Sequence, residues 1–252
     1  MEKKRTIRGI GSRVFGAGVA ALGLACLVFG EFDPGQQVPK NFPARVTLAY
    51  CAGAFMVAAA LAIEWRRTRA WGAAALAVYY TLFVLLLMDG HILLQGYAVY
   101  GSYEELAMQL AIAACALIVY ASCAEIDRLI ATRITRIARM AFGVCCVIWG
   151  GAHFMYMNMT APLVPKWLPF GQVFWGYLTG VFFIAAGVAL VTGIRARLAS
   201  ALLTVMIACF GLLANGPMLV GDPSSHFNWT ESALNLALIG AAWVVADSLD
   251  PS

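Results

Sequence analysis

Charged residues are scarce in this chain of 252 residues. They make up 12% of it, whereas a soluble domain carries about 25%. Hydrophobic residues make up 62%, and a surface with so few charges cannot face water over its whole extent. A soluble enzyme, a nucleic-acid-binding module and a disordered chain therefore fit poorly. The composition predicts an integral membrane protein whose main partner is the lipid bilayer.

Several motifs of known chemistry are missing. There is no P-loop, dinucleotide fingerprint, HExxH or nucleophile elbow, which argues against ATP-driven transport within this chain. There is no CxxC, and the closest cysteine pair is Cys145-Cys146, so most of the seven cysteines are interpreted as small apolar packing residues. The three histidines are too scattered to suggest haem ligation, and no metal site is predicted.

Long apolar runs dominate what is present. A membrane-spanning helix needs roughly 20 apolar residues, and eight runs approach that length. They are 14–30, 44–63, 70–88, 105–124, 140–157, 171–192, 198–214 and 232–246. The runs are continuous, without the alternation of a membrane β-strand, so the predicted fold class is all-α with eight transmembrane helices.

The basic residues predict the orientation of these spans. With the N-terminus inside, the inner side holds 14 of the 17 lysines and arginines and the outer side holds only Lys40, Arg45 and Lys166. Positive charge gathers on the cytoplasmic side of membrane proteins. We therefore expect a multi-pass protein of the bacterial inner membrane with both termini in the cytoplasm.

The chain matches itself when shifted by 126 residues. Glu105 falls on Glu231, Gln109 on Asn235, and Val38-Pro39-Lys40 on Val164-Pro165-Lys166. Each half holds four spans, and an even number gives both halves the same orientation. This pattern predicts two parallel four-helix repeats, 1–124 and 140–252.

The joint between the two repeats, 125–139, is basic and amphipathic. Its isoleucines share one helical face and its arginines occupy the rest. A helix of this kind is attracted to anionic lipid at the inner leaflet. The alternative is a helical extension of the fourth or fifth span.

Polar side chains gather at the outer ends of the spans in both halves, and those that could bind a ligand are Asp89, His91, Glu105, Gln109, Asn215, His226, Glu231 and Asn235. An acid and an amide one turn apart lie on the same helical face, so each bundle could direct such a pair inward. Ser102-x-x-Glu105 and Asn228-x-x-Glu231 also resemble capping boxes, which would give the glutamates a structural role. Buried amides, in turn, often join helices rather than bind ligands.

His153 lies near the outer end of the fifth span. An ionisable residue at membrane depth is costly and is therefore a candidate for function, here a catalytic one. The alternative is a histidine that is hydrogen-bonded to a neighbouring helix or that reaches the interface.

The segment around His153 resembles the DoxX-like membrane proteins. The resemblance rests on Gly150-Gly151-Ala152-His153-Phe154, Val164-Pro165-Lys166-Trp167-Leu168-Pro169 and Tyr177-Leu178-Thr179-Gly180-Val181. It implies a duplicated four-helix unit, quinone as a cofactor, His153 as the reactive polar group and a redox partner subunit. A glutamate that often follows the Thr-Gly-Val of that family is absent, because Phe182-Phe183-Ile184 stands there.

Three functions remain open from the sequence. The first is a subunit in quinone-linked redox metabolism, which rests on the resemblance. The second is a small-solute transporter or channel, which rests on the paired outer acids and amides. The third is a membrane scaffold with no chemistry of its own.

Overall fold

The computed structural model describes residues 9–249, apart from the side chains of Ile92 and Leu93. Within that range the chain is helical and contains no strand, and eight helices are long and apolar enough to cross a membrane. The prediction of an all-α, eight-span membrane protein is therefore confirmed. The spans are α2 (Ile10–Phe29), α3 (Arg45–Glu64), α4 (Arg69–Val78) with η1 (Tyr79–Met88), α6 (Tyr100–Cys123), α7 (Arg128–Met155), α9 (Gln172–Thr192), α10 (Ala196–Phe210) with η3 (Gly211–Asn215) and α11 (Gly216–Gly221), and α12 (His226–Ser248). Short elements, α5 (Gly90–Gly96), α8 (Met157–Thr160) and η2 (Ala161–Leu163), lie between them.

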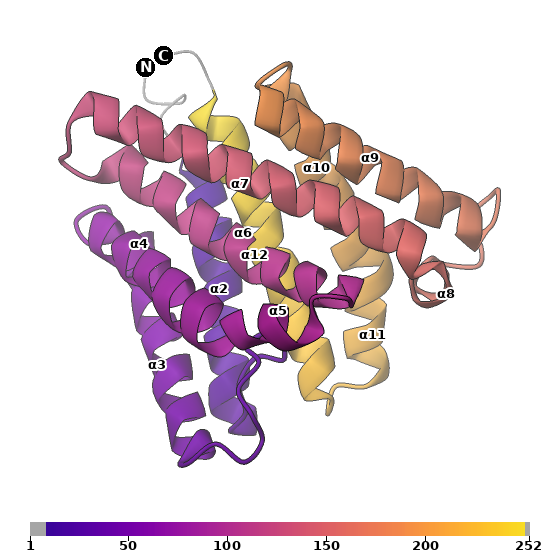
Figure 1. Ribbon diagram of the computed structural model, residues 1–252, viewed down its shortest axis with the longest axis horizontal. Coiled ribbons are helices and arrows are strands. Elements are labelled where there is room, and N and C mark those ends of the chain that lie inside the picture. The colour runs from indigo at the N-terminus through magenta and orange to yellow at the C-terminus, as the bar shows by residue number, and fades with distance from the viewer. Residues whose placement is uncertain (1–8, 250–252) are drawn as a thin grey trace.

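The spans form a closed ring in chain order (Figure 1). Each packs on the next, α12 returns to pack on α2, and α6 and α12 also contact each other across the middle. The pairing of α2 with α12 has its counterpart in the pairing of α7 with α6. Each half therefore uses the same order of neighbours.

Helix ends in the two halves fall at matching positions. Phe29 ends α2 and Met155 ends α7, and Tyr100 begins α6 as His226 begins α12. Ala44 and Phe170, which precede α3 and α9, both have positive φ angles, 53° and 70°. Each of these pairs is separated by the 126 residues of the predicted repeat.

Glycines let the helices of the ring approach closely. A Cβ added at Gly18 would lie 2.2 Å from the backbone nitrogen of Ala237, and one at Gly240 would lie 2.1 Å from that of Phe15. Both contacts join α2 to α12, the first and last spans of the chain, and so close the ring. Small residues at such crossings replace the hydrophobic driving force that helices lack within lipid.

Two helices begin earlier than the sequence predicted. α6 begins at Tyr100 after Val99, and α12 begins at His226, where the Ser225 side chain accepts a hydrogen bond from the Asn228 backbone. Ser102 and Asn228 are thus inside their helices, and the expected capping boxes are wrong. Glu105 and Glu231 lie beyond the first turn, so capping does not account for them.

The segment from Arg128 onward is continuous with the fifth span. Asp127 caps α7 by accepting hydrogen bonds from the backbones of Leu129 and Ile130. Residues 128–139 are therefore the first turns of α7, which matches the interpretation of this segment as a helical extension of the fifth span.

The two ends of the bundle differ in charge. At the end that we call the basic end, α2 begins, α12 ends, and the arginine-rich connections 65–68 and 193–195 lie. At the opposite end, which we call the acidic end, lie the long 30–44 connection and the first turns of α6 and α12. The third and seventh spans both turn into π-helix as they approach the acidic end, η1 and η3, a distortion that is frequent at functional sites.

Candidate functional site

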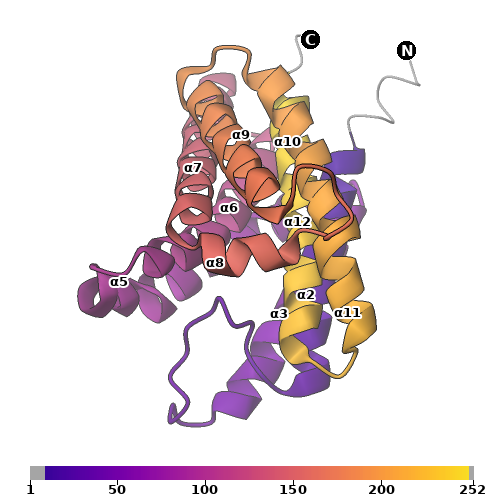
Figure 2. The ribbon, with the colours of Figure 1, turned by 90° about the vertical axis from the view of Figure 1, so that its right-hand side faces the viewer.

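The 30–44 connection folds back into the bundle at the acidic end (Figure 2). Phe32, Asp33 and Gln36 are only 2–3% exposed. The sequence Asp33-Pro34-Gly35 makes the turn, since the Gly35 amide donates to Asp33 Oδ1 at 3.4 Å and the Gln36 amide donates to the Asp33 carbonyl at 2.8 Å. The connection between two spans thereby places the polar side chains of Asp33 and Gln36 between helices.

Hydrogen bonds join this loop to the third and fourth spans. The Gln37 backbone donates to Asp89 Oδ1 at 3.2 Å, and its side chain donates to Glu105 Oε2 at 2.8 Å. Gln109 Nε2 donates to Asp33 Oδ2 at 3.4 Å. Asp89 and Gln109 are 1% and 0% exposed, so these polar groups meet where little water reaches.

The eighth span adds a further carboxyl group from the other half of the chain. Asp33 and Glu104 lie close enough to Glu231 to act on it electrostatically, and α6 packs on α12. We call Asp33, Asp89, Glu104, Glu105 and Glu231 the acidic cluster. It draws on a loop, the end of η1, α6 and α12.

Two acceptor atoms, one in the acidic cluster and one on the adjacent Gln109, lack a donor among the described residues. Asp89 Oδ2 and Gln109 Oε1 are buried and make no hydrogen bond within the described residues. At this end Arg45 forms an ion pair with Glu31, which lies outside the cluster. No described lysine or arginine forms an ion pair with a member of the cluster, so its acceptors outnumber its donors.

Burial raises the pKa of the two aspartates of the acidic cluster, both of which lie outside the spans. It raises the pKa of Asp33 to about 6, and the hydrogen bonds from Gly35 and Gln109 only partly offset this effect. Burial likewise raises the pKa of Asp89 to about 7, against the hydrogen bond from Gln37, and the nearby charges of Asp33 and Glu105 raise it further. At neutral pH a substantial share of Asp89 therefore holds a proton.

A second layer of polar contacts supports the loop from below. Tyr79 donates to Gln36 Oε1 at 3.1 Å, and Gln36 Nε2 lies 3.7 Å from Met56 Sδ. Tyr80 also donates to that sulfur, at 3.2 Å. Gln36 is thus held by α3 and η1, which fixes the path of the loop beneath the cluster.

The two amides of the second half have structural partners. Asn235 Nδ2 donates to the Ile207 carbonyl at 3.2 Å, and Asn215 Nδ2 donates to the Glu231 carbonyl at 3.1 Å. Both bonds join the seventh span to α12 through backbone. Asn215 and Asn235 therefore act as links between helices, the alternative that the sequence left open, whereas Gln109 faces the loop.

His153 lies apart from the acidic cluster, between α7, α9 and α10. Its Nδ1 lies 3.0 Å from the Gly176 carbonyl and 3.1 Å from the Thr179 hydroxyl, so the ring is hydrogen-bonded to α9 through Nδ1. The rings of Phe183 and Phe210 lie 5.5 and 6.3 Å from it.

The other two histidines do not join the cluster either. His226 packs on the Phe29 ring at 4.9 Å and lies near Glu31 and Arg45. His91 is half-buried on α5, and no described hydrogen bond or ion pair links it to the cluster. Of the eight predicted ligand-binding residues, the structure brings together Asp89, Glu105, Gln109 and Glu231.

A cavity of about 450 Å³ lies at the same end, beside the V-P-K-x-x-P loop of the second half, Val164–Pro169. Lys166, Trp167 and Gln172 line it together with Leu213 and Met218 of the seventh span. The V-P-K-x-x-P loop of the second half is thus a wall of this cavity, whereas its counterpart in the first half follows the buried turn.

Sequence reasoning missed Asp33, Gln36 and Gln37. They lie in a loop, and nothing in their spacing predicts burial. A comparison of the halves held a signal, because the corresponding positions 159, 162 and 163 are Met, Pro and Leu. Polar residues that occur in only one half of the chain therefore indicated where the two halves differ.

The DoxX-like resemblance stays a prediction, since the comparisons do not bear on it. No family model, no curated protein and no solved structure matches this chain.

Proposed function

We propose that this multi-pass membrane protein exchanges small cations that donate N–H hydrogen bonds for protons, and that the acidic cluster is the binding site. The single observation that carries the proposal is the surplus of buried acceptors. When Asp89 is ionised, its Oδ2 and Gln109 Oε1 face no donor in the described chain, and buried acceptors without donors are costly.

The composition of the cluster favours a cation over a neutral solute. Its carboxyl groups come from four elements and no described base neutralises them. Buried like charges cannot all ionise together, so the empty site holds protons. A cation that enters can replace those protons and leave the total charge of the site unchanged.

The geometry favours hydrogen bonding over metal coordination. Among the described residues, no three His, Cys, Asp or Glu side chains converge in a way that could hold a metal ion. The carboxylates are instead held by hydrogen bonds from amides, Asp33 by Gln109 and Asp89 and Glu105 by Gln37. Planar or tetrahedral N–H donors match such separated oxygens.

Exchange follows from the acidity of Asp89. Its carboxyl O–H bond breaks, the proton leaves to water at the acidic end, and the carboxylate pairs with the arriving cation. One proton leaves for each monovalent cation, so the step is electroneutral. A pKa of about 7 lets Asp89 take either state near neutral pH.

The test uses purified protein in liposomes that contain a pH-sensitive dye. Guanidinium is the probe, because it is permanently charged and its three NH₂ groups carry six N–H donors. We expect guanidinium outside to raise the luminal pH as protons leave. Tetramethylammonium, which has the same charge and no N–H group, should produce no change.

Variants separate the cluster from the rest of the acidic end. Asp89→Asn and Glu105→Gln should abolish the guanidinium-driven change. Asp222→Asn, which removes an exposed carboxylate at the same end, should leave it intact. Guanidinium transport that proceeds equally in Asp89→Asn, or that is absent from the unmodified protein, would refute the proposal.

A second candidate, quinone-linked redox chemistry, has one specific observation in its favour. His153 is bound to α9 through Nδ1 and lies beside Phe183 and Phe210, and its Nε2 can form a hydrogen bond with a quinone carbonyl or a quinol hydroxyl. Quenching of tryptophan fluorescence by decylubiquinol, lost in His153→Phe and kept in His91→Phe, would support this candidate. Absence of quenching in the unmodified protein would eliminate it.

We further propose that the chain is a tandem duplication of a DoxX-like unit in a bacterial inner membrane, with both termini cytoplasmic. The matched helix ends and the matched neighbours of α2 and α7 support the duplication. The arginines of the basic end support the orientation, because positive charge favours the cytoplasmic side. A redox partner subunit belongs to the second candidate alone.

A further inference from the structure

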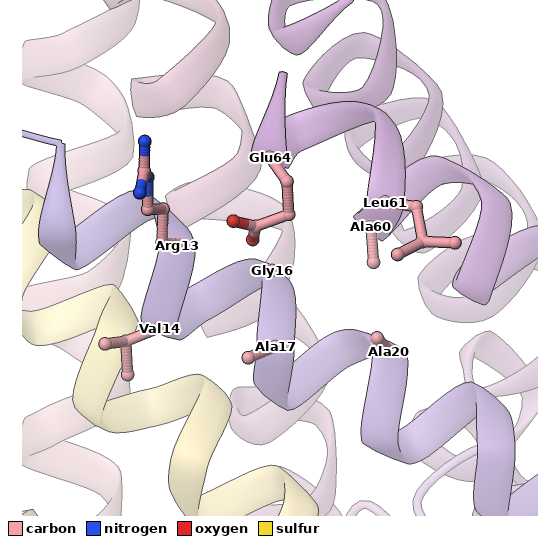
Figure 3. Close-up of a pocket in the computed structure, with 8 residues that line it drawn as sticks. All are labelled: Arg13, Val14, Gly16, Ala17, Ala20, Ala60, Leu61 and Glu64. Carbon is pink, nitrogen blue, oxygen red and sulfur yellow. The ribbon is translucent and has the colours of Figure 1, made fainter. Parts of the chain in front are cut away.

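A second cavity, of about 420 Å³, lies between α2 and α3 at the basic end of the bundle (Figure 3). Its walls are Val14, Gly16, Ala17, Ala20, Ala60 and Leu61, and its polar rim is formed by Arg13 and Glu64. Ala17 and Leu61 are exposed on the outer surface of the ring. The cavity is therefore a groove that faces the hydrocarbon of the bilayer, with its two charged residues at the membrane surface.

The two charged residues of the rim are close but unpaired. Arg13 and, from α4, Arg69 act electrostatically on Glu64, yet no ion pair joins either of them to it among the described residues. Glu64 Oε1 is buried and makes no described hydrogen bond. It lies directly against α2, since a Cβ added at Gly16 would approach it to 2.6 Å.

A buried carboxylate oxygen at the end of an apolar groove requires a donor. Figure 3 shows the carboxylate of Glu64 turned toward the Arg13 side of the groove. Ala20, Ala60 and Leu61 lie farther along it. A ligand that fills this shape has an apolar chain, a cationic N–H donor for Glu64 and an anionic group for Arg13. These three features occur together in one class of membrane lipid.

We propose that the groove binds a zwitterionic phospholipid with a primary ammonium headgroup, of the phosphatidylethanolamine type. One acyl chain lies along Ala17, Ala20 and Ala60. The ammonium group donates to Glu64 Oε1, and the phosphate pairs with Arg13. Phosphatidylcholine cannot satisfy Glu64 because its headgroup has no N–H, and an anionic lipid brings a second negative charge toward the carboxylate.

Native mass spectrometry of the intact, purified protein tests this site. The protein is exposed to equal amounts of phosphatidylethanolamine, phosphatidylcholine and phosphatidylglycerol with the same acyl chains. We expect phosphatidylethanolamine to be retained about tenfold over phosphatidylcholine, the ratio that one charge-assisted hydrogen bond of about 1.4 kcal/mol provides.

Three variants assign the preference to the groove. Glu64→Gln should remove the preference for phosphatidylethanolamine while lipid still binds. Ala17→Leu should lower retention of every lipid, because the larger side chain occupies the groove; its exposed position makes it compatible with folding. Arg67→Gln, in the adjacent connection and outside the groove, should behave like the unmodified protein.

Three results overturn the proposal. Equal retention of the three lipids would show that the headgroup is not recognised. Preference for phosphatidylglycerol would show that Arg13 acts as a general anion site. A preference that survives both Glu64→Gln and Ala17→Leu would place the lipid elsewhere on the protein.

Discussion

Gln109 on α6 donates its side-chain N–H to Asp33 in the α2–α3 connection, at 3.4 Å and out of contact with solvent. This bond joins residues 76 positions apart and closes the acidic end over the bundle. It also leaves Gln109 Oε1 without a donor among the residues that the structure describes. The same amide therefore holds the loop with one atom and offers an acceptor to a ligand with the other.

Gln109 and Asn235, which correspond in the predicted repeat, should respond differently to the same change. Gln109→Leu should abolish the guanidinium-dependent proton movement, because it removes the acceptor and releases Asp33. Asn235→Leu should lower stability by about 1 kcal/mol through loss of its bond to Ile207, and transport should persist. Equal loss of transport in both, at matched stability, would contradict the division between ligand site and helix link.

Stability should depend on pH through Asp89 and Asp33. Both have folded-state pKa values above their ordinary value, about 7 and about 6, so the folded protein binds protons that the unfolded chain releases. The contribution of these two groups to the free energy of unfolding is then fully present below about pH 4 and is lost as the pH rises through about 6 and 7. Melting temperature in detergent should fall by a few degrees between pH 5 and 8, at about 2–4 °C per kcal/mol.

Asp89→Asn provides the control for that dependence. The neutral amide cannot lose a proton, so the fall above pH 6 should be smaller and the remaining change should centre on Asp33. A variant whose melting temperature falls as steeply as that of the unmodified protein would show that another group governs the pH response.

The contact between α2 and α12 should tolerate no added side chain. Gly240→Ala would bring a Cβ to 2.1 Å from the backbone of Phe15, and the helices must separate along the contact. Overpacking of this kind costs about 1–3 kcal/mol, measurable as a lower midpoint of unfolding in detergent. Gly221→Ala is the matched control, because its Cβ would meet nothing within 4 Å.

Reporter fusions should divide the connections into two sets. Fusions after Arg67 and after Ile194 should report the cytoplasm, and fusions after Lys40 and after Lys166 should report the opposite side, since positive charge resists translocation. Opposite locations for Arg67 and Ile194 are incompatible with four spans between them. That outcome would remove both the orientation and the parallel duplication.

Much of the fold follows from the sequence because lipid imposes a simple rule. Backbone groups within a bilayer must be satisfied internally, so a run such as 171–192 becomes a helix whatever its neighbours are. Span boundaries were less predictable. Tyr100 and His226 begin their helices several residues before the apolar runs, since polar first turns can extend a helix into the interface.

The candidate site divides in the same way. The sequence by itself determined that acids and amides cluster near the ends of the third, fourth, seventh and eighth spans, because their spacing along a helix is fixed. Only the tertiary structure decided which of them meet. Burial of Asp33 and Gln36 depends on how the 30–44 connection folds over η1 and α6, and no local periodicity encodes a contact between residues 76 positions apart. The same long-range packing gave Asn215 and Asn235 backbone partners and left Gln109 Oε1 with no donor in the described part of the chain.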